Sequence, residues 1–161
     1  MKNSLSARTR LAGLAIVISV LLVLPLAGCG GGGGGGSSTI PINLSGASDV
    51  GSLHIELVYD PAILEVTAVK AGKLAQNAVV DSNITTPGRA IIGIVSSNGI
   101  AGSGAVASVT FKAKAKTGSS ALTLENVEAY SAETLQDIRT QVSAGQYNAQ
   151  TKKVDAPSIS F

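Results

Sequence analysis

Apolar and polar side chains alternate along most of the chain after residue 40. A period of two predicts β-strands that turn one face toward a core and the other toward solvent. The clearest run covers residues 53–59. It places one set of side chains on the predicted inner face and a second set on the outer face: Leu53, Ile55, Leu57 and Tyr59 against His54, Glu56 and Val58.

Further alternating runs follow at spacings near ten residues. The expected strands cover residues 40–44, 53–59, 64–71, 74–80, 89–96, 105–115, 121–127 and 141–149, with turns at 45–51 and 97–104. Asp60-Pro61 ends one strand because proline supplies no N–H for a ladder. Residues 128–139 fit either a helical turn or a short hairpin. Many short strands without a long helical pattern predict an all-β, jelly-roll β-sandwich of about eight to nine strands.

The pattern differs at both ends of the chain. Residues 1–10 are polar and cationic, residues 11–27 are almost wholly apolar, and seven glycines follow at Gly30–Gly36. Glycine-rich sequence predicts a flexible tether. Residues 150–161 are mainly polar and predict a loosely attached tail. The expected organisation is therefore a signal segment (1–28), a tether (29–39), a β-sandwich (40–149) and a C-terminal tail (150–161).

The end of the N-terminal segment reads Leu26-Ala27-Gly28-Cys29. With the cationic and apolar regions before it, this motif resembles the lipobox of a bacterial lipoprotein signal peptide. The resemblance implies export, cleavage before Cys29 and a covalent lipid on that thiol, which anchors the protein to a membrane. Gly30 favours the outer over the inner membrane. The alternative is an uncleaved transmembrane anchor, because seventeen apolar residues reach the lower limit of a spanning helix.

Charge and cysteine content narrow the function classes. The chain has twelve Lys and Arg and ten Asp and Glu. Three of the cations, Lys2, Arg8 and Arg10, lie in the signal segment, so the remainder carries nine basic and ten acidic side chains. A nucleic-acid partner, which needs clustered cations, is therefore not expected. Cys29 is the only cysteine, which excludes an internal disulfide.

The sequence offers no catalytic constellation. Its only histidine is His54, expected as an exposed strand residue, and it has no Gly-x-Ser-x-Gly motif. Several carboxylates could in principle form a glycosidase pair, but no spacing selects two of them: Asp60, Glu65, Glu125, Glu128 and Glu133. One histidine and no Asp-x-Asp-x-Asp-Gly run also give no zinc or calcium site. We expect a non-enzyme with no metal and no cofactor beyond the lipid.

Lys112, Lys114 and Lys116 share one face of the expected strand 105–115 and its continuation. They fit a solvated face that discourages edge pairing, or a cationic stripe that binds an acidic partner. We predict the stripe as the candidate binding site. Aromatic residues are few and Trp is absent, which argues against a flat aromatic platform for sugars.

Three segments in order resemble the cohesin domain. They are Gly51-Ser-Leu-His-Ile-Glu-Leu-Val-Tyr-Asp-Pro-Ala-Ile-Leu-Glu-Val66, the Thr110-Phe111-Lys112 strand at residues 104–115, and Leu122-Thr-Leu-Glu-Asn-Val127. Gly145-Gln-Tyr-Asn148 is similar to the family's Gly-led closing strand. The resemblance implies a nine-stranded jelly roll that binds a dockerin, a small calcium-containing helical module on another protein, through one flat sheet face.

The chain departs from the cohesin pattern where an opening strand normally precedes residues 40–44. Glycines stand there, so either the C-terminal tail covers the sheet edge or the domain is a shortened copy. We predict a lipid-anchored, cell-surface module that docks a dockerin-like protein. The alternatives are a carbohydrate- or polysaccharide-binding module of the same superfamily and a structural envelope lipoprotein.

Overall fold

A computed structural model describes residues 36–161. The predictions for the signal segment, for Cys29 and for most of the tether lie outside that range. The described part contains nine strands and one short 3-10 helix. Their bounds are β1 Ser37–Val58, β2 Leu64–Ala71, η1 Lys73–Ala75, β3 Val79–Asn83, β4 Arg89–Ala113, β5 Ser119–Ser131, β6 Gln141–Ser143, β7 Gly145–Asn148, β8 Val154–Asp155 and β9 Ser158–Ser160. The expected all-β class and strand number are confirmed. Within this part, no helix has the length and apolar character needed to cross a membrane.

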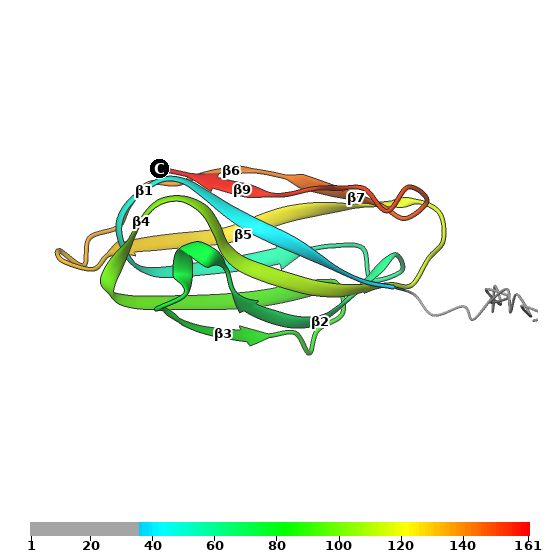
Figure 1. Cartoon of the computed structure of the whole chain (residues 1–161), viewed down its shortest axis with the longest axis horizontal. Helices are drawn as coiled ribbons and strands as arrows, with labels where there is room; N and C mark the ends of the chain where they lie inside the picture. Colours follow the sequence, from blue (N-terminus) through cyan, green and yellow to red (C-terminus); the bar gives the residue numbers. More distant parts are fainter. Residues whose placement is uncertain (1–35) are drawn as a thin grey trace, which may run out of the picture. The chain divides into compact units, whose positions relative to one another are not determined.

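Two long, bent strands, β1 and β4, form the frame of the domain (Figure 1). They pair antiparallel from Ser37 opposite Lys112 to Val58 opposite Arg89. The predicted turns at residues 45–51 and 97–104 are wrong, because both segments are bends inside continuous strands. Pairing persists through the bend, where Val50 lies opposite Ile100, and both side chains are buried.

The bends divide the strands between two layers. The four-stranded layer consists of β3, β4 residues 89–95, β1 residues 52–58 and β5, in that hydrogen-bonded order. The opposite layer consists of β2, β4 residues 104–113 and β1 residues 37–45, and β9 adds to it. At its other edge β5 pairs with β7, and β7 pairs with β8.

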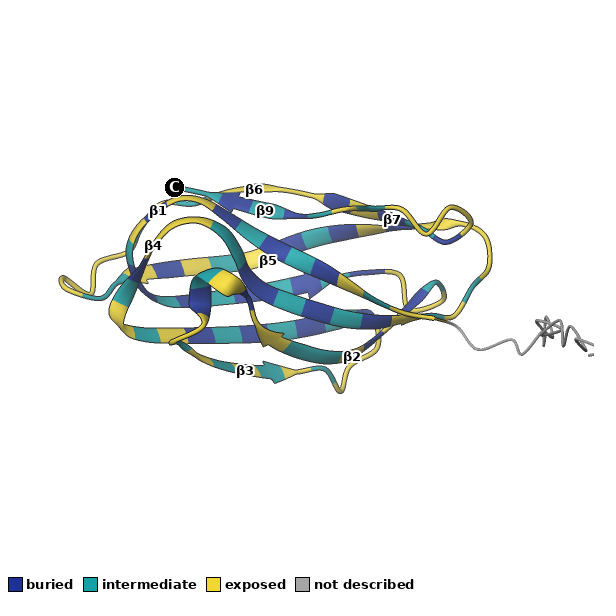
Figure 2. Cartoon of the chain, viewed as in Figure 1, coloured by how far each residue is buried: buried dark blue, intermediate teal, exposed yellow. Residues whose placement is uncertain are grey.

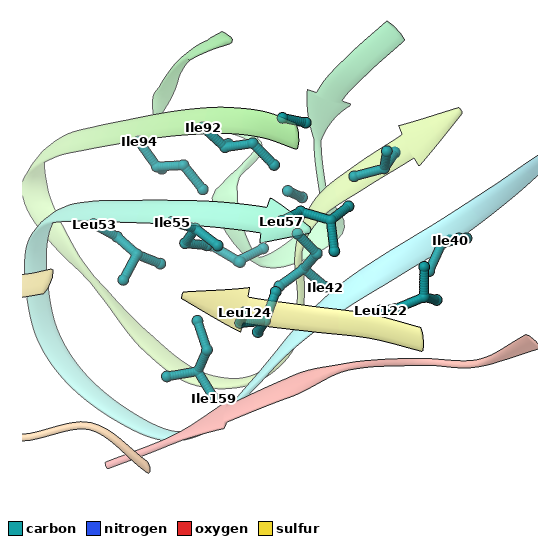
Figure 3. Packing of buried hydrophobic residues seen from close by; sticks show 14 of the residues in the cluster. Ile40, Ile42, Leu53, Ile55, Leu57, Ile92, Ile94, Leu122, Leu124 and Ile159 are labelled. Atoms are coloured by element: carbon teal, nitrogen blue, oxygen red, sulfur yellow. The ribbon is translucent and has the colours of Figure 1, made fainter. Parts of the chain in front are cut away.

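The core lies between these layers. Buried and less buried residues alternate along β1, β4 and β5 (Figure 2). Side chains from both layers converge on one cluster (Figure 3): Ile40, Ile42, Leu53, Ile55, Leu57, Ile92, Ile94, Leu122, Leu124 and Ile159. The rings of Phe111 and Tyr147 meet edge to face at 4.9 Å between centroids, which joins β4 to β7. Within residues 36–161, the buried members of this cluster run from Ile40 to Ile159 and form a hydrophobic core.

Three segments differ from the expected elements. The run 74–80 is the 3-10 helix η1 followed by a strand that begins only at Val79. The run 141–149 is two strands with different partners, since β6 pairs with β9 and β7 pairs with β5. In the ambiguous segment 128–139, β5 continues to Ser131 and the chain returns to a bridge between Tyr130 and Asp137, which is the hairpin alternative.

The C-terminal segment is not a loosely attached tail. Strand β9 pairs in parallel with residues 43–45 of β1 and antiparallel with β6, and Ile159 is fully buried. Backbone hydrogen bonds from Asn43 N to Pro157 O and from Phe161 N to Ser45 O extend the attachment. Of the two alternatives for the missing opening strand, the structure bears out coverage by the tail over this part of the β1 edge.

Candidate functional site

Alternate residues of the four-stranded layer point away from the core and form an outer surface, which we call the front face. The strand register arranges them in cross-strand rows: Val79, Val95, Ser52 and Tyr130; then Asp81, Gly93, His54 and Glu128; then Asn83, Ile91, Glu56 and Glu125; then Arg89, Val58 and Thr123. Neighbouring strands lie about 4.8 Å apart, so a row spans roughly 14 Å. That width accommodates one helix.

The row nearest the bend of β1 is apolar and exposed. Val79 and Val95 are 72% and 57% exposed, and Tyr130 is 39% exposed. Leu135, in the turn after β5, is 76% exposed. Val95, Tyr130 and Leu135 line a hollow of about 230 Å³ together with serines and small residues of the adjoining strands. Clustered exposed apolar side chains of this kind mark interaction surfaces.

The turn that carries Leu135 is fixed to the bend of β1 by Asp49. Asp49 Oδ2 accepts hydrogen bonds from Ser131 Oγ at 2.5 Å and from the backbone N–H of Glu133 at 3.2 Å. The Asp49 carbonyl oxygen accepts a third from the N–H of Ala132. The apolar end of the front face is therefore held in place rather than carried on a free loop.

The remaining rows are mainly acidic. They contain four carboxylates, those of Glu56, Asp81, Glu125 and Glu128, and one guanidinium, that of Arg89. Arg89 donates to Glu56 Oε2, and its second terminal nitrogen lies 3.6 Å from Glu125 Oε2. In residues 36–161, Asp81 and Glu128 form no ion pair. Two carboxylates of the face are thus left for a partner.

A bulge in β5 puts Glu125 and Glu128 on the same face. Glu56 lies opposite Glu125 and His54 lies opposite Glu128, so three steps on β5 match two on β1. Asn126 takes a left-handed conformation, with φ of 47°, which absorbs the extra residue. Period-two alternation would have placed the two glutamates on opposite faces.

The centre of the front face is hollowed at Gly93. Asp81 and His54 flank this glycine in its row, and the hollow of about 210 Å³ is lined by His54, Asp81, Ser82, Asn83, Ile91 and Gly93. His54 Nε2 lies 3.8 Å from Glu56 Oε1, beyond hydrogen-bonding distance. His54 has no arrangement with a nucleophile here. The described residues include no group of three or more His, Cys, Asp or Glu that could hold a metal ion.

The predicted lysine stripe lies elsewhere. Lys112 is exposed in the opposite layer, where it faces Glu65 of β2, and the exposed Lys114 and Lys116 follow the end of β4. Lys114 also lines a hollow of about 210 Å³ with Tyr59, Glu65 and neighbouring residues. Lys112 therefore does not share the front face, and the stripe stays a prediction.

A family model described as the cohesin domain matches residues 32–149, well over half of the chain. The chain belongs to the cohesin family. Cohesins are binding modules without catalytic activity. A search of curated proteins finds no match.

Solved cohesin structures share the fold. A non-cellulosomal cohesin from the archaeon Archaeoglobus fulgidus is 28% identical with a TM-score of 0.60, over 79% of this chain and 80% of that chain. The sixth cohesin of Acetivibrio cellulolyticus scaffoldin B, solved with a Cel5 dockerin, is 22% identical with a TM-score of 0.63, over 73% and 91%. The cohesin CaCohA2 of Clostridium acetobutylicum is 22% identical with a TM-score of 0.61, over 76% of this chain and 86% of that chain.

Sequence reasoning missed the front face as a site. One signal was available in residues 89–96, where Ile91 and Val95 occupy the positions that alternation assigns to solvent. A strand that is apolar on both faces is typical of burial on both faces. The contributions of Val79 and Leu135 depend on elements whose bounds the sequence placed wrongly or left open.

Proposed function

We propose that this cohesin is a docking module that binds a calcium-loaded, dockerin-like helical partner through the front face. The observation that carries the proposal is the exposed apolar row at Val79, Val95 and Tyr130, extended by Leu135. It lies on a sheet surface wide enough for a helix. Family membership supports the same partner class, since related cohesins were solved in complex with dockerins.

Binding of residues 36–161 to a panel of purified dockerin modules, with calcium and with a chelator, tests the proposal. We expect at least one dockerin to bind with calcium only, and Tyr130→Ala to weaken that complex by about tenfold or more, as is typical of the loss of an aromatic anchor. Val142→Ala is the matched control, because Val142 is an exposed apolar residue on β6, outside the front face. Calcium-independent binding, or equal loss in both variants, would contradict the proposal.

We also propose that a lipid on Cys29 holds the module at the cell envelope, with the outer membrane as its destination. The Leu26-Ala27-Gly28-Cys29 motif supports this part. Growth with an alkyne-tagged fatty acid should label the wild-type chain and leave Cys29→Ser unlabelled. An unlabelled wild-type chain, retained in the membrane through its apolar segment, would favour the uncleaved anchor instead.

The stripe of Lys112, Lys114 and Lys116 is a second predicted contact surface for an acidic partner. It lies on the opposite layer, so it adds to the front face only if the partner reaches both sides of the domain. Replacement of all three lysines with Glu should weaken the complex if the stripe contributes. Unchanged affinity would place the stripe outside the interface.

No observation favours the carbohydrate-binding alternative. Among residues 36–161, Tyr130 is the only exposed aromatic residue, at 39%, while Tyr59, Phe111 and Tyr147 are buried and Phe161 is partly buried. Stacking platforms for sugars use several exposed rings, so a single tyrosine beside Leu135 fits a protein contact better.

A further inference from the structure

Gly93 occupies the centre of the front face without a structural requirement for glycine. It lies inside β4 between the buried Ile92 and Ile94, and its backbone avoids the left-handed region that favours glycine. A Cβ added at this position meets no atom within 4 Å. Glycine inside a strand weakens the strand, and it commonly marks a place where a ligand approaches closely. Neither backbone geometry nor packing therefore explains this residue.

The missing side chain creates the central hollow. In the cross-strand row, Gly93 separates Asp81 from His54, whose backbones lie roughly 10 Å apart at the usual strand spacing. The side chain of Ile91, one row away, gives the hollow an apolar wall. This combination suits a side chain with an apolar stem and a polar end.

The charge around the hollow is negative. Asp81 Oδ1 accepts a hydrogen bond from the N–H of Ser82, which leaves the second carboxylate oxygen for another donor. Glu128 lies in the same row beyond His54, and neither carboxylate is engaged in an ion pair in the described chain. The one guanidinium of the face, that of Arg89, is already held by Glu56 and Glu125.

We propose that the Gly93 hollow is a subsite that receives a lysine or arginine side chain of the docking partner. This inference rests on the proposed docking function, since it names the chemistry of the partner at the same face. The aliphatic stem passes over Gly93 against Ile91, and the cationic end donates to Asp81. The subsite selects partners with a basic residue near the centre of the docking helix.

Synthetic helical peptides of fifteen residues test the subsite directly. Four peptides share one sequence, with leucines for the apolar row, and differ only at the central residue: Lys, Arg, norleucine or Glu. They are titrated into isotope-labelled residues 36–161 and followed by the amide signals of Gly93 and Asp81. We expect the Lys and Arg peptides to bind about tenfold tighter than the norleucine peptide, as for a close charge pair, and the Glu peptide to bind most weakly.

Gly93→Val fills the hollow. It should abolish the higher affinity of the Lys peptide, while the affinity of the norleucine peptide should stay the same or rise slightly. Gly93→Ala is the milder variant in case valine disturbs the strand, and thermal unfolding checks both folds. Asp81→Asn should reduce the Lys advantage without changing the hollow. The inference is overturned if the norleucine and Lys peptides bind equally, if Gly93→Val keeps the Lys preference, or if millimolar Lys peptide leaves the Gly93 signal unmoved.

The dockerin panel separates the failure of this inference from that of the docking function. A dockerin that binds wild type and Gly93→Val equally would remove the subsite and retain docking. If no dockerin of the panel binds but the domain still prefers the Lys peptide, the proposal of a dockerin partner fails and the subsite is retained.

Discussion

Leu135 combines two features that are unfavourable in an isolated domain. Its side chain is 76% exposed, and its backbone has a φ of 57°, in the left-handed region that branched and bulky residues avoid. A strained position persists where surrounding contacts fix it, and here Asp49 holds the turn. Leu135 lines the same hollow as Tyr130 and Val95. We therefore expect this leucine to contribute to binding rather than to folding.

Leu135→Asn should therefore separate stability from docking. Asparagine tolerates the left-handed region, so we expect the free energy of unfolding to stay equal or to rise by up to about 1 kcal/mol. Dockerin affinity should fall by roughly tenfold, because an exposed apolar anchor is lost. Urea unfolding and a binding titration on the same preparation measure both effects. A fall in stability with unchanged affinity would show that Leu135 serves the fold.

Gly93 in β4 and Gly145 in β7 provide a matched pair. A Cβ on Gly145 would overlap the carbonyl oxygen of Asp155 and the nitrogen of Pro157, whereas a Cβ on Gly93 meets open space. Gly145→Ala should lower the free energy of unfolding by about 2 kcal/mol or more through overpacking. Gly93→Ala should raise it by about 0.4 to 1 kcal/mol by reducing the entropy of the unfolded chain. Equal effects of the two changes in urea unfolding would contradict this assignment.

At the scale of elements, the bends of β1 and β4 decide where the binding face lies. Register shifts occur from Leu44 to Ser52 along β1, opposite the glycine-rich segment 99–104 of β4. Gly99, Gly102 and Gly104 all have positive φ, which lets the paired strands turn together. The paired strands β1 and β4 thereby contribute to both layers. Residues 52–58 of β1 and 89–95 of β4 lie in the layer that carries the front face.

Among the residues that follow the segment matched by the family model, we expect strand β9 to contribute most to the stability of the domain. The family model ends at residue 149, yet β9 follows it and buries Ile159 completely. Ile159→Ala should lower the free energy of unfolding by about 2 to 5 kcal/mol, as for other fully buried isoleucines.

Lys153→Ala is the control for this change, since Lys153 is exposed in the same segment and forms only a surface ion pair with Asp155 at 3.4 Å. Its effect should stay within about 0.5 kcal/mol. Denaturant unfolding of both variants decides the matter. Similar values for Ile159→Ala and Lys153→Ala would mean that the segment is dispensable.

At the scale of the whole domain, the apolar row is remote from the start of the described chain. Strand β1 starts at one end of the domain, and its bend lies at the other end (Figure 1). Ser52 follows this bend along β1. Ser52 and Val58 are six steps apart along β1, which corresponds to about 20 Å. A module attached through its N-terminal side would present the apolar row at its far end.

The front face carries a net negative charge, with the carboxylates of Glu56, Asp81, Glu125 and Glu128 and the guanidinium of Arg89. If a basic partner binds the acidic front face, its association rate should fall as sodium chloride rises from 50 to 500 mM, because the screening length shortens from above 10 Å to a few Å. Stopped-flow binding measures the rate. Asp81→Asn with Glu128→Gln should flatten this dependence, whereas an unchanged salt dependence would show that these carboxylates do not steer the partner.

The alternation of side chains determined much of this protein by itself. It predicted the all-β class and the inward set of Leu53, Ile55 and Leu57, because period-two burial is a local property of a strand. The cohesin resemblance came from three sequence motifs and not from the alternation. The sequence placed its candidate binding site on the lysines and did not find the front face.

Only the tertiary structure decided which residues share a surface. The bends in β1 and β4, the bulge at Asn126 and the return of Ile159 to the β1 edge all depend on pairing between segments far apart in the chain. Local alternation carries no information about such pairing, since a shift of one residue reverses every face without changing the pattern. The proposed roles of Gly93 and Leu135 depend on neighbouring residues that are distant in the sequence and come together only on folding.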